Sequence, residues 1–310
     1  MIKEPIKLLP AFKDYLWGGT KLRTEYGKKT DLEKVAESWE LSNHKDGQSI
    51  VASGECKGML FGEYIKKYDV IGKKANEFDF FPILIKFIDA KDSLSVQVHP
   101  DDEYSLKNNG EYGKTEMWYV MDCDEGATLY YGFNREITKD EFRKRIDNNT
   151  LLEVLNEVPV KKGDVFFIKS GTVHAIGKGL MICEIQQNSN TTYRVYDYDR
   201  RDANGNPREL HIEKAIEVSD LKPPAKDDIS EENVLAKCKY FTVEKYLVNG
   251  CMDININEDC FKSIINLSGS GRLEYDGGVI EFSKGESIFI PAQNTNMKII
   301  GDCEIIVSYV

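Results

Sequence analysis

The sequence is poor in histidine, in paired cysteines and in long apolar stretches. Its four histidines leave few imidazoles for metal binding, so the surroundings of each can be weighed singly. The seven cysteines are odd in number and form no C-x-x-C pair, which argues against a disulfide framework and fits reduced thiols in the cytosol. The most apolar run, "FFPILIKFIDA", is too short to span a membrane, and the N-terminus lacks the apolar core of a signal peptide. We therefore expect a cytoplasmic protein.

Positive charge is also in short supply. The formal net charge of −11 argues against a broad basic surface for nucleic acid or for an anionic membrane, and we expect neither partner. Any anionic ligand must therefore meet a local cluster of cations. Arg200 and Arg201 in "YRVYDYDRRD" are candidates for phosphate contact, because a guanidinium matches two phosphate oxygens at once. Adjacent strand residues face opposite ways, so only one of the two is expected to point inward.

Strand signals dominate the sequence. Short runs rich in Ile, Val, Phe and Tyr recur between Gly, Asn and Asp, which is typical of antiparallel sandwiches and barrels. Helical signals are few and are expected at residues 61–69, 138–146, 150–158 and 208–218. The second of these begins with the capping-box pair Thr138 and Glu141. The sequence therefore predicts a mainly β fold with a few short helices.

A break in composition divides the chain. The stretch 220–233 combines a proline pair with a run of charges, as linkers and surface connections do. We expect an N-terminal domain at residues 1–232 and a C-terminal domain at residues 233–310. The strand-rich pattern resumes after this stretch, so both domains are expected to be built from β-strands.

A weak repeat links the two parts. In each, a glycine is followed by an acid, an apolar strand, a turn and a polar residue eleven positions after the glycine. This residue is His174 after Gly163 in the first copy and Asn296 after Gly285 in the second. No histidine follows His211. The pattern indicates two units of one architecture, and we expect the second to lack a transition-metal site.

The stretch "LSVQVHPDD" alternates strictly between polar and aliphatic residues. In an extended chain Ser95, Gln97 and His99 project to one side, whereas the aliphatic residues between them project to the other. A hydroxyl, an amide and an imidazole held together need partners if that space is buried. A metal ion or a sugar would supply them, and by parity with Gln97 we expect Ser95 to line a pocket.

Two further segments carry residues that suit a metal. His174 ends a strand in "SGTVHAIG", and "GKTEMWYVM" places Lys114 and Glu116 on one face of another strand. Two imidazoles, one carboxylate and the Gln97 amide form a mixed nitrogen and oxygen set that suits Zn²⁺ or another first-row divalent ion. The alternative is that His99 and His174 are satisfied core histidines and that Glu116 is exposed. We assign His44 and His211, the other two histidines, structural roles.

The order of these motifs resembles one enzyme family. "KDYLWGGTKL", "ESWELSNH", "QVHP", "KTEMWYV", "GTVHAIG" and "EIQQNSNTTYRVYDYDR" closely resemble the type I phosphomannose isomerases (mannose-6-phosphate isomerases), zinc enzymes of the cupin superfamily. The likeness runs from near the N-terminus to about residue 215 and is looser beyond 235. No room exists between Glu116 and His174 for the helical insertion of the eukaryotic members, so the chain resembles the compact bacterial form. The resemblance implies two cupin-type jelly rolls, of which the C-terminal one is degenerate.

The resemblance also implies roles for seven residues. The proposed ligands of a single Zn²⁺ are Gln97, His99, Glu116 and His174. The residues matching the family's catalytic positions are Lys114, Glu184 and Arg194, although solvated or ion-paired charges are the alternative for each. Ser95 and Trp17 are the expected substrate-binding residues. Trp17 is read equally well as a wall for the sugar or as a core aromatic residue.

The activity implied is that of an aldose–ketose isomerase in carbohydrate metabolism. It would interconvert mannose 6-phosphate and fructose 6-phosphate by moving a proton through a cis-enediol, with a small sugar phosphate as partner and a monomer or weak homodimer as the assembly. Glu184 is the first candidate base, with zinc-bound hydroxide or Lys114 as alternatives, and Arg194 would stabilise oxyanion charge. Two rival functions stay open, a non-enzymatic sugar-binding cupin and an iron cupin oxygenase, although the fourth, amide ligand counts against the iron enzyme.

Overall fold

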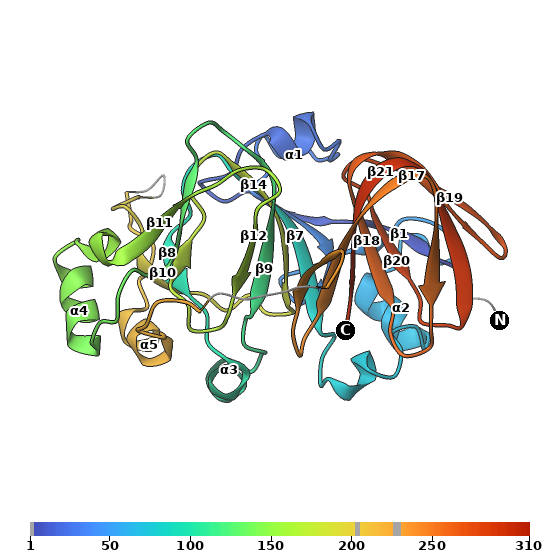
Figure 1. Ribbon diagram of the computed structural model, residues 1–310. Helices are drawn as coiled ribbons and strands as arrows, with labels where there is room; N and C mark the ends of the chain where they lie inside the picture. Colours follow the sequence, from blue (N-terminus) through green and yellow to red (C-terminus); the bar gives the residue numbers. More distant parts are fainter. Residues whose placement is uncertain (1–2, 202–204, 226–230) are drawn as a thin grey trace.

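The computed structural model describes residues 3–201, 205–225 and 231–310, and its strands form two β-units that lie side by side (Figure 1). The prediction of a mainly β fold is confirmed. No helix among the described residues has the length and apolarity needed to cross a bilayer. All seven cysteines are free thiols.

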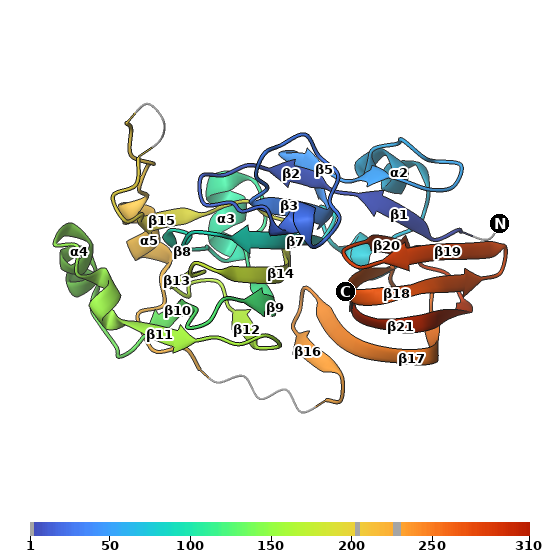
Figure 2. The same cartoon turned by 90° about the horizontal axis from the view of Figure 1, so that it is seen from above.

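The first unit contains two sheets (Figure 2). The six-stranded sheet has the order β12-β9-β14-β7-β3-β2 and the five-stranded sheet the order β11-β10-β13-β8-β15. The strands of the six-stranded sheet are β2 (Ala11–Lys13), β3 (Glu37–Leu41), β7 (Ile83–Ala90), β9 (Glu116–Cys123), β12 (Val165–Ile168) and β14 (Leu180–Gln187). Those of the five-stranded sheet are β8 (Val96–Val98), β10 (Thr128–Phe133), β11 (Leu155–Pro159), β13 (His174–Ala175) and β15 (Tyr193–Tyr196). All pairings within both sheets are antiparallel.

The second unit is one eight-stranded sheet, and two of its strands come from the N-terminal part of the chain. Its own strands are β16 (Val234–Lys237), β17 (Thr242–Ile256), β18 (Lys262–Tyr275), β19 (Gly278–Ser283), β20 (Ser287–Ile290) and β21 (Thr295–Tyr309). The added strands are β1 (Ile6–Leu9), which pairs with β20, and β6 (Ile50–Val51), which pairs with β1. The sheets therefore do not follow a division of the chain at residues 232 and 233, and that domain boundary remains a prediction.

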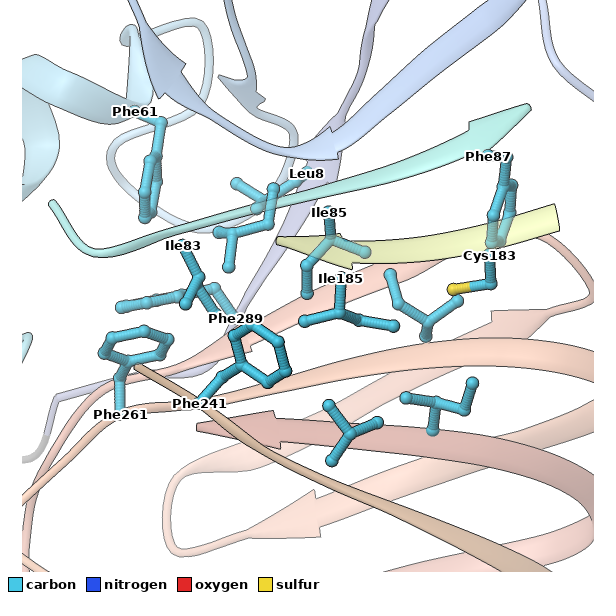
Figure 3. Close-up of a cluster of buried hydrophobic side chains, with 14 of the residues drawn as sticks. Leu8, Phe61, Ile83, Ile85, Phe87, Cys183, Ile185, Phe241, Phe261 and Phe289 are labelled. Carbon is cyan, nitrogen blue, oxygen red and sulfur yellow. The ribbon is translucent and has the colours of Figure 1, made fainter. Parts of the chain in front are cut away.

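A large apolar cluster joins the two units (Figure 3). Ile85 on β7 and Ile185 on β14 point from the six-stranded sheet towards Phe241 and Phe289 of the second unit. The opposite face of β7 looks into the first unit, and every residue of this strand is buried. A strand covered on both faces is expected to be apolar throughout. Lys86, the one basic residue in β7, is therefore conspicuous.

The helices agree in part with the sequence. The predicted helices at 61–69 and 138–146 are α2 (Phe61–Lys67) and α4 (Lys139–Asp147), and the Thr138 side chain caps α4 by accepting the Glu141 N–H. The helix expected at 150–158 is wrong, because a short 3₁₀ turn there gives way to β11, which pairs with β10. In the stretch 208–218 the helix, α5 (Ile212–Val218), is shorter than predicted.

The remaining helical and extended elements are short. They are α1 (Lys21–Thr24), α3 (Asp102–Asn109), α5 (Ile212–Val218), the 3₁₀ turns Ala75–Glu77 and Leu151–Val154, and the small hairpin of β4 (Asn43–His44) and β5 (Gly47–Gln48). The sequence reading missed α3, which the Asp101 side chain caps by accepting the Tyr104 N–H. Gly110 ends this helix in the left-handed conformation that glycine adopts at low cost. This helix carries the chain towards the first residue of β9.

Candidate metal centre

Three buried side chains converge inside the first unit. His99 follows β8, Glu116 begins β9 and His174 begins β13, so the two sheets contribute from opposite sides. One ligand atom from each of the three lies within 4.8 Å of the others, and all three residues are fully or almost fully buried. The imidazole centroids of His99 and His174 are 4.8 Å apart. The structure therefore brings together three of the four predicted metal ligands in a group that can hold a metal ion.

Backbone carbonyls fix the tautomer of both imidazoles. His99 Nδ1 lies 2.9 Å from the Thr191 carbonyl oxygen, and His174 Nδ1 lies 2.8 Å from that of Thr172. A carbonyl only accepts, so each Nδ1 carries the hydrogen and each neutral ring has its lone pair on Nε2. Burial lowers the pKa of His174 to about 4 and holds the pKa of His99 well below its ordinary value, with the Lys114 charge adding to the effect at His99. Both rings are thus neutral near pH 7 and can each offer Nε2 to a metal ion.

The Glu116 carboxylate is the strongest sign that a cation fits here. Its Oε1 lies 3.4 Å from His174 Nε2 and its Oε2 lies 3.7 Å from His99 Nε2, so two lone pairs face an anion. Neither oxygen accepts a well-directed hydrogen bond within the described part of the chain. Burial raises the pKa of Glu116, and the Lys114 ammonium, 2.8 Å from Oε2, opposes that rise. A divalent ion among these groups would remove the repulsion and the desolvation cost together.

Gln97 is placed to add a fourth ligand. It pairs with His174 across β8 and β13, and its Nε2 lies 3.4 Å from His174 Nε2. An amide can turn over, which exchanges its nitrogen for its oxygen, so this contact also places a potential oxygen ligand beside the imidazole. The spacing of two between Gln97 and His99 puts both on one strand face, as the alternation of the sequence predicted.

A polar pocket of about 270 Å³ adjoins the three-residue cluster. Of the residues predicted to be functional, the pocket is lined by Trp17, Ser95, Gln97, Lys114, Glu184 and Arg194. Sequence reasoning missed six other polar wall residues: Tyr15, Glu37, Lys86, Asn190, Thr192 and Arg208. The available signals were Lys86 within "PILIKFID" and Glu37 in "ESWEL", because a lone charge in an apolar strand needs a buried partner.

Glu184, Lys86 and Glu37 form a buried row of alternating charge. The Lys86 ammonium lies 3.3 Å from Glu184 Oε2 and 3.7 Å from Glu37 Oε2. Burial opposes the charge on Lys86, but the two carboxylates outweigh it and raise its pKa. Burial likewise tends to raise the pKa of Glu184, but Lys114, Lys86 and the indole N–H of Trp118, 3.0 Å from Oε1, lower it overall. Glu184 is therefore held ionised although its side chain is buried.

Guanidinium groups line another part of the pocket. Arg194 on β15 pairs with Gln97 on β8, and its Nε donates to Ser95 Oγ at 3.2 Å. Arg208 also lines the pocket and is held by Asp197 through its Nε at 2.7 Å. Neither Arg200 nor Arg201, the two candidates for phosphate contact, lines the pocket. Arg200 donates to the Ser93 carbonyl instead.

Trp17 was predicted either to form a wall for the sugar or to be a core aromatic residue, and comparison with the nearby Tyr15 decides between these roles. Trp17 is only 4% exposed and packs in an apolar cluster, although its edge reaches the pocket wall. Tyr15 is 38% exposed, lines the same pocket and lies with its ring 5.7 Å from that of Trp17. Trp17 is thus mainly a core residue, and Tyr15 offers the more accessible ring.

The second unit shows no comparable cluster over its described residues 231–310. Asn296, the counterpart of His174 in the weak repeat, is exposed and accepts a hydrogen bond from Asn255. His44 is buried and bonded to Glu111, whereas His211 precedes α5 and its ring lies beside that of Tyr193. The predicted absence of histidine ligands from the second unit follows from the sequence itself.

A mainly β fold with two buried imidazoles and a carboxylate beside a polar pocket defines a metal-binding enzyme of the cupin class. Residues 6–126 match the sequence model of the phosphomannose isomerase type I catalytic domain, and residues 231–310 match that of the mannose-6-phosphate isomerase cupin domain. Mannose-6-phosphate isomerase ManA of Bacillus subtilis is 40% identical over the full length of both chains. The chain belongs to the type I phosphomannose isomerase family, as its motifs predicted.

Two further similarities extend over the whole chain. Mannose-6-phosphate isomerase of Streptococcus mutans is 39% identical and covers 99% of this chain, which covers 98% of that protein. The crystal structure of the mannose 6-phosphate isomerase from Bacillus subtilis superposes with a TM-score of 0.91 at 38% identity, covering 99% of this chain and all of the other. The expected architecture with a C-terminal cupin domain is confirmed by these matches.

Proposed function

We propose that this protein interconverts mannose 6-phosphate and fructose 6-phosphate as a Zn²⁺-dependent isomerase. The observation that carries the proposal is one pocket that adjoins a buried group able to hold a metal ion and is lined by an ionised carboxylate and two guanidinium groups. The relatives that match this chain over almost its whole length are named mannose-6-phosphate isomerases, and this supports the same substrate. Reduced thiols and the lack of a membrane-spanning helix among the described residues fit a cytoplasmic enzyme.

The residues that would hold the single zinc ion are Gln97, His99, Glu116 and His174. Their two nitrogen and two oxygen donors suit Zn²⁺, and the adjoining pocket leaves room for a substrate at the ion. When bound, the metal would supply Lewis-acid stabilisation of negative charge on the sugar oxygens. Lys114 lies 3.1 Å from His99 Nε2 and 2.8 Å from Glu116 Oε2, so its charge adds to the positive field at the same place.

The proton transfer is assigned to the polar wall of the pocket. The isomerisation moves one proton between C2 and C1 of the open-chain sugar and a second between O2 and O1, through a cis-enediol. Glu184 is ionised, faces the pocket and is held between the Trp118 indole and Lys86, so it is the proposed proton carrier. Arg194 stabilises charge on the enediolate oxygens, and Arg194 with Arg208 offers a cationic wall for the phosphate. Ser95 orients Arg194.

The assay that tests this function measures turnover of mannose 6-phosphate coupled to detection of fructose 6-phosphate. Turnover should vanish after treatment with a chelator and return on addition of Zn²⁺, with a panel of free and phosphorylated aldoses run in parallel. A protein that binds Zn²⁺ and mannose 6-phosphate without turnover would be the sugar-binding cupin. Activity that returns only with Fe²⁺ and consumes O₂ would be the oxygenase. The assembly, a monomer or weak homodimer, remains a prediction for sedimentation analysis.

A further inference from the structure

The loop between β14 and β15, residues 188–192 with the sequence "NSNTT", runs beside the metal centre. Its Thr191 carbonyl oxygen accepts the Nδ1 hydrogen of His99 at 2.9 Å, and its Asn190 and Thr192 line the pocket. The position of this loop therefore fixes which nitrogen of His99 is free for a metal and how the His99 ring is turned. Whatever holds the loop also holds the ligand.

Glu111 holds the outer side of this loop. Its Oε2 accepts the backbone N–H of Asn190 at 2.9 Å and the hydroxyl of Ser189 at 3.3 Å. Glu111 lies in the connection between α3 and β9, outside the cluster of metal-binding residues, and its side chain is 18% exposed. Burial tends to raise the pKa of Glu111, but hydrogen bonds from His44 and Asn190 outweigh it and lower the pKa to about 2. The anchor is thus a charged acceptor, which makes the stronger hydrogen bond.

His44 holds Glu111 in turn. The ring is 5% exposed, and its Nδ1 accepts the backbone N–H of Asp46 at 3.1 Å. An Nδ1 that accepts leaves the hydrogen on Nε2, which lies 3.1 Å from Glu111 Oε2 and donates to it. This tautomer is the opposite of that of the two metal-binding histidines. The Asp46 side chain accepts a second bond from the Asn190 amide at 2.8 Å, so one hairpin, β4–β5, secures the loop twice.

A second anchor acts on the other end of the loop. The Gln186 side-chain amide donates to the carbonyls of Gln187 and Ser189, at 2.8 and 2.6 Å. Loss of Glu111 would therefore loosen the Asn190–Thr191 end of the loop, leaving the Asn190 side chain bonded to Asp46, while Gln186 keeps the end next to β14 in place. The consequence should be local to His99, because the carbonyl that orients His174 belongs to Thr172 on a different segment.

We propose that Glu111, held by His44, is a positioning residue that fixes loop 188–192 and so orients His99 for metal binding. This inference rests on the proposed metal site at His99, and not on the identity of the sugar. Glu111 touches neither the pocket nor the metal-binding group, so its effect is exerted through Asn190 and Thr191.

The test compares Glu111→Ala with the wild type in two measurements that do not involve turnover. The first is Zn²⁺ affinity, measured by competition with a chromophoric chelator, which should fall about tenfold to a hundredfold, as losses of outer-shell partners do. The second is the ring ¹⁵N spectrum of the metal-free protein labelled at histidine, assigned by replacing each of the four histidines in turn. The His99 signals should shift or broaden while those of His174 stay in place.

Matched variants separate positioning from general damage. Glu111→Gln keeps an oxygen that can accept the Asn190 N–H, so it should recover most of the Zn²⁺ affinity. Lys45→Met removes only the exposed ion pair with Glu111 Oε1 and should match the wild type.

Wild-type affinity together with unchanged His99 signals in Glu111→Ala would overturn the proposal. Should that variant fail to fold, His44→Leu decides: it should lower the affinity in the same direction, and an unchanged affinity would overturn the proposal. A protein with intact Zn²⁺ affinity and no isomerase activity would contradict the proposed function alone.

Discussion

Gln97 and His174 face each other directly across β8 and β13, with the two Nε2 atoms 3.4 Å apart. The His174 Nδ1 hydrogen is committed to the Thr172 carbonyl, so His174 Nε2 is an acceptor and the Gln97 amide donates to it. The same amide, turned over, presents its oxygen at that place. Gln97 can therefore bond to His174 in the metal-free protein and, with the amide turned over, could offer its oxygen to a metal ion.

The first prediction concerns Gln97 as a ligand. Gln97→Leu removes the amide oxygen at similar volume, so Zn²⁺ affinity should fall by at least the roughly tenfold to hundredfold that loss of an outer-shell partner costs. Competition with a chelator measures it. Ser95→Ala, on the same strand face and bonded to Arg194, should leave the affinity unchanged. Equal affinities for Gln97→Leu and wild type would remove Gln97 from the ligand set.

The second prediction concerns Glu184 as the proton carrier. Glu184→Gln keeps the shape and the indole contact from Trp118 but removes the basic oxygen. Exchange of the C2 proton of mannose 6-phosphate with solvent deuterium should be abolished, while Zn²⁺ remains bound. Exchange is followed by proton NMR, and metal content by elemental analysis. Exchange near the wild-type rate would show that another group, such as Lys114, carries the proton.

The third prediction concerns the buried charge on Lys86. Lys86→Met leaves the carboxylates of Glu184 and Glu37 without their shared cation, which should lower the free energy of unfolding by about 3–5 kcal/mol. Denaturant titration of the metal-free protein measures the loss. Lys86→Arg should retain most of the stability, and adding Glu184→Gln to Lys86→Met should recover part of it. A loss below about 1 kcal/mol would show that water reaches the row of charges.

The fourth prediction concerns the contribution of Glu111 to the loss of folding stability at acidic pH. The pKa of Glu111 is about 2 in the folded protein, below its ordinary value of 4.5, so the unfolded chain binds the proton first as pH falls. Its contribution is therefore complete above pH 4.5 and is lost as pH falls towards 2. In Glu111→Gln the free energy of unfolding lost between pH 4.5 and pH 2 should be smaller by on the order of 2 kcal/mol. This is less than the full pKa shift implies, because the carboxylate is partly solvated. Denaturant titrations from pH 2 to 6 measure this. Identical slopes in the variant and the wild type would be inconsistent with the prediction.

The candidate metal ligands could be predicted from the sequence because their signals are local. Gln97 and His99 share a strand face by the period of two, and the acid and the second histidine sit in short motifs at the start of two other strands, β9 and β13. Lys86 could be recognised in the sequence as a lone charge in an apolar strand. Its two partners, Glu37 and Glu184, lie on other strands, and only the sheet register reveals them. Glu111 has no local signal, because its role depends on a loop 78 to 79 residues further along the chain.

Three features of the fold were also not predicted, each for its own physical reason. The stretch 150–158 carries a helical pattern of Leu and Val, but pairing of Leu155–Pro159 with β10 overrides it. Helix α3 is nearly all polar, so it offered no apolar period, although Asp101 and Gly110 mark its ends. The transfer of β1 into the sheet of the second unit could not be foreseen, because Ile6 pairs with Phe289 at the far end of the chain.

The fifth prediction concerns recognition of the phosphate. Arg208 lines the pocket, whereas Arg201 is exposed and bonded to its own loop, so the pair forms a matched comparison. Arg208→Ala should raise the KM for mannose 6-phosphate about tenfold, the effect of losing one hydrogen bond between charged groups. The effect is moderated because Asp197 already shares the Arg208 charge. Turnover of free mannose, where detectable, should change little, because that sugar has no phosphate to contact. Arg201→Ala should leave both unchanged. A fall in kcat at constant KM would instead place Arg208 at the reacting carbons, and Arg194 would then be the remaining cation for the phosphate.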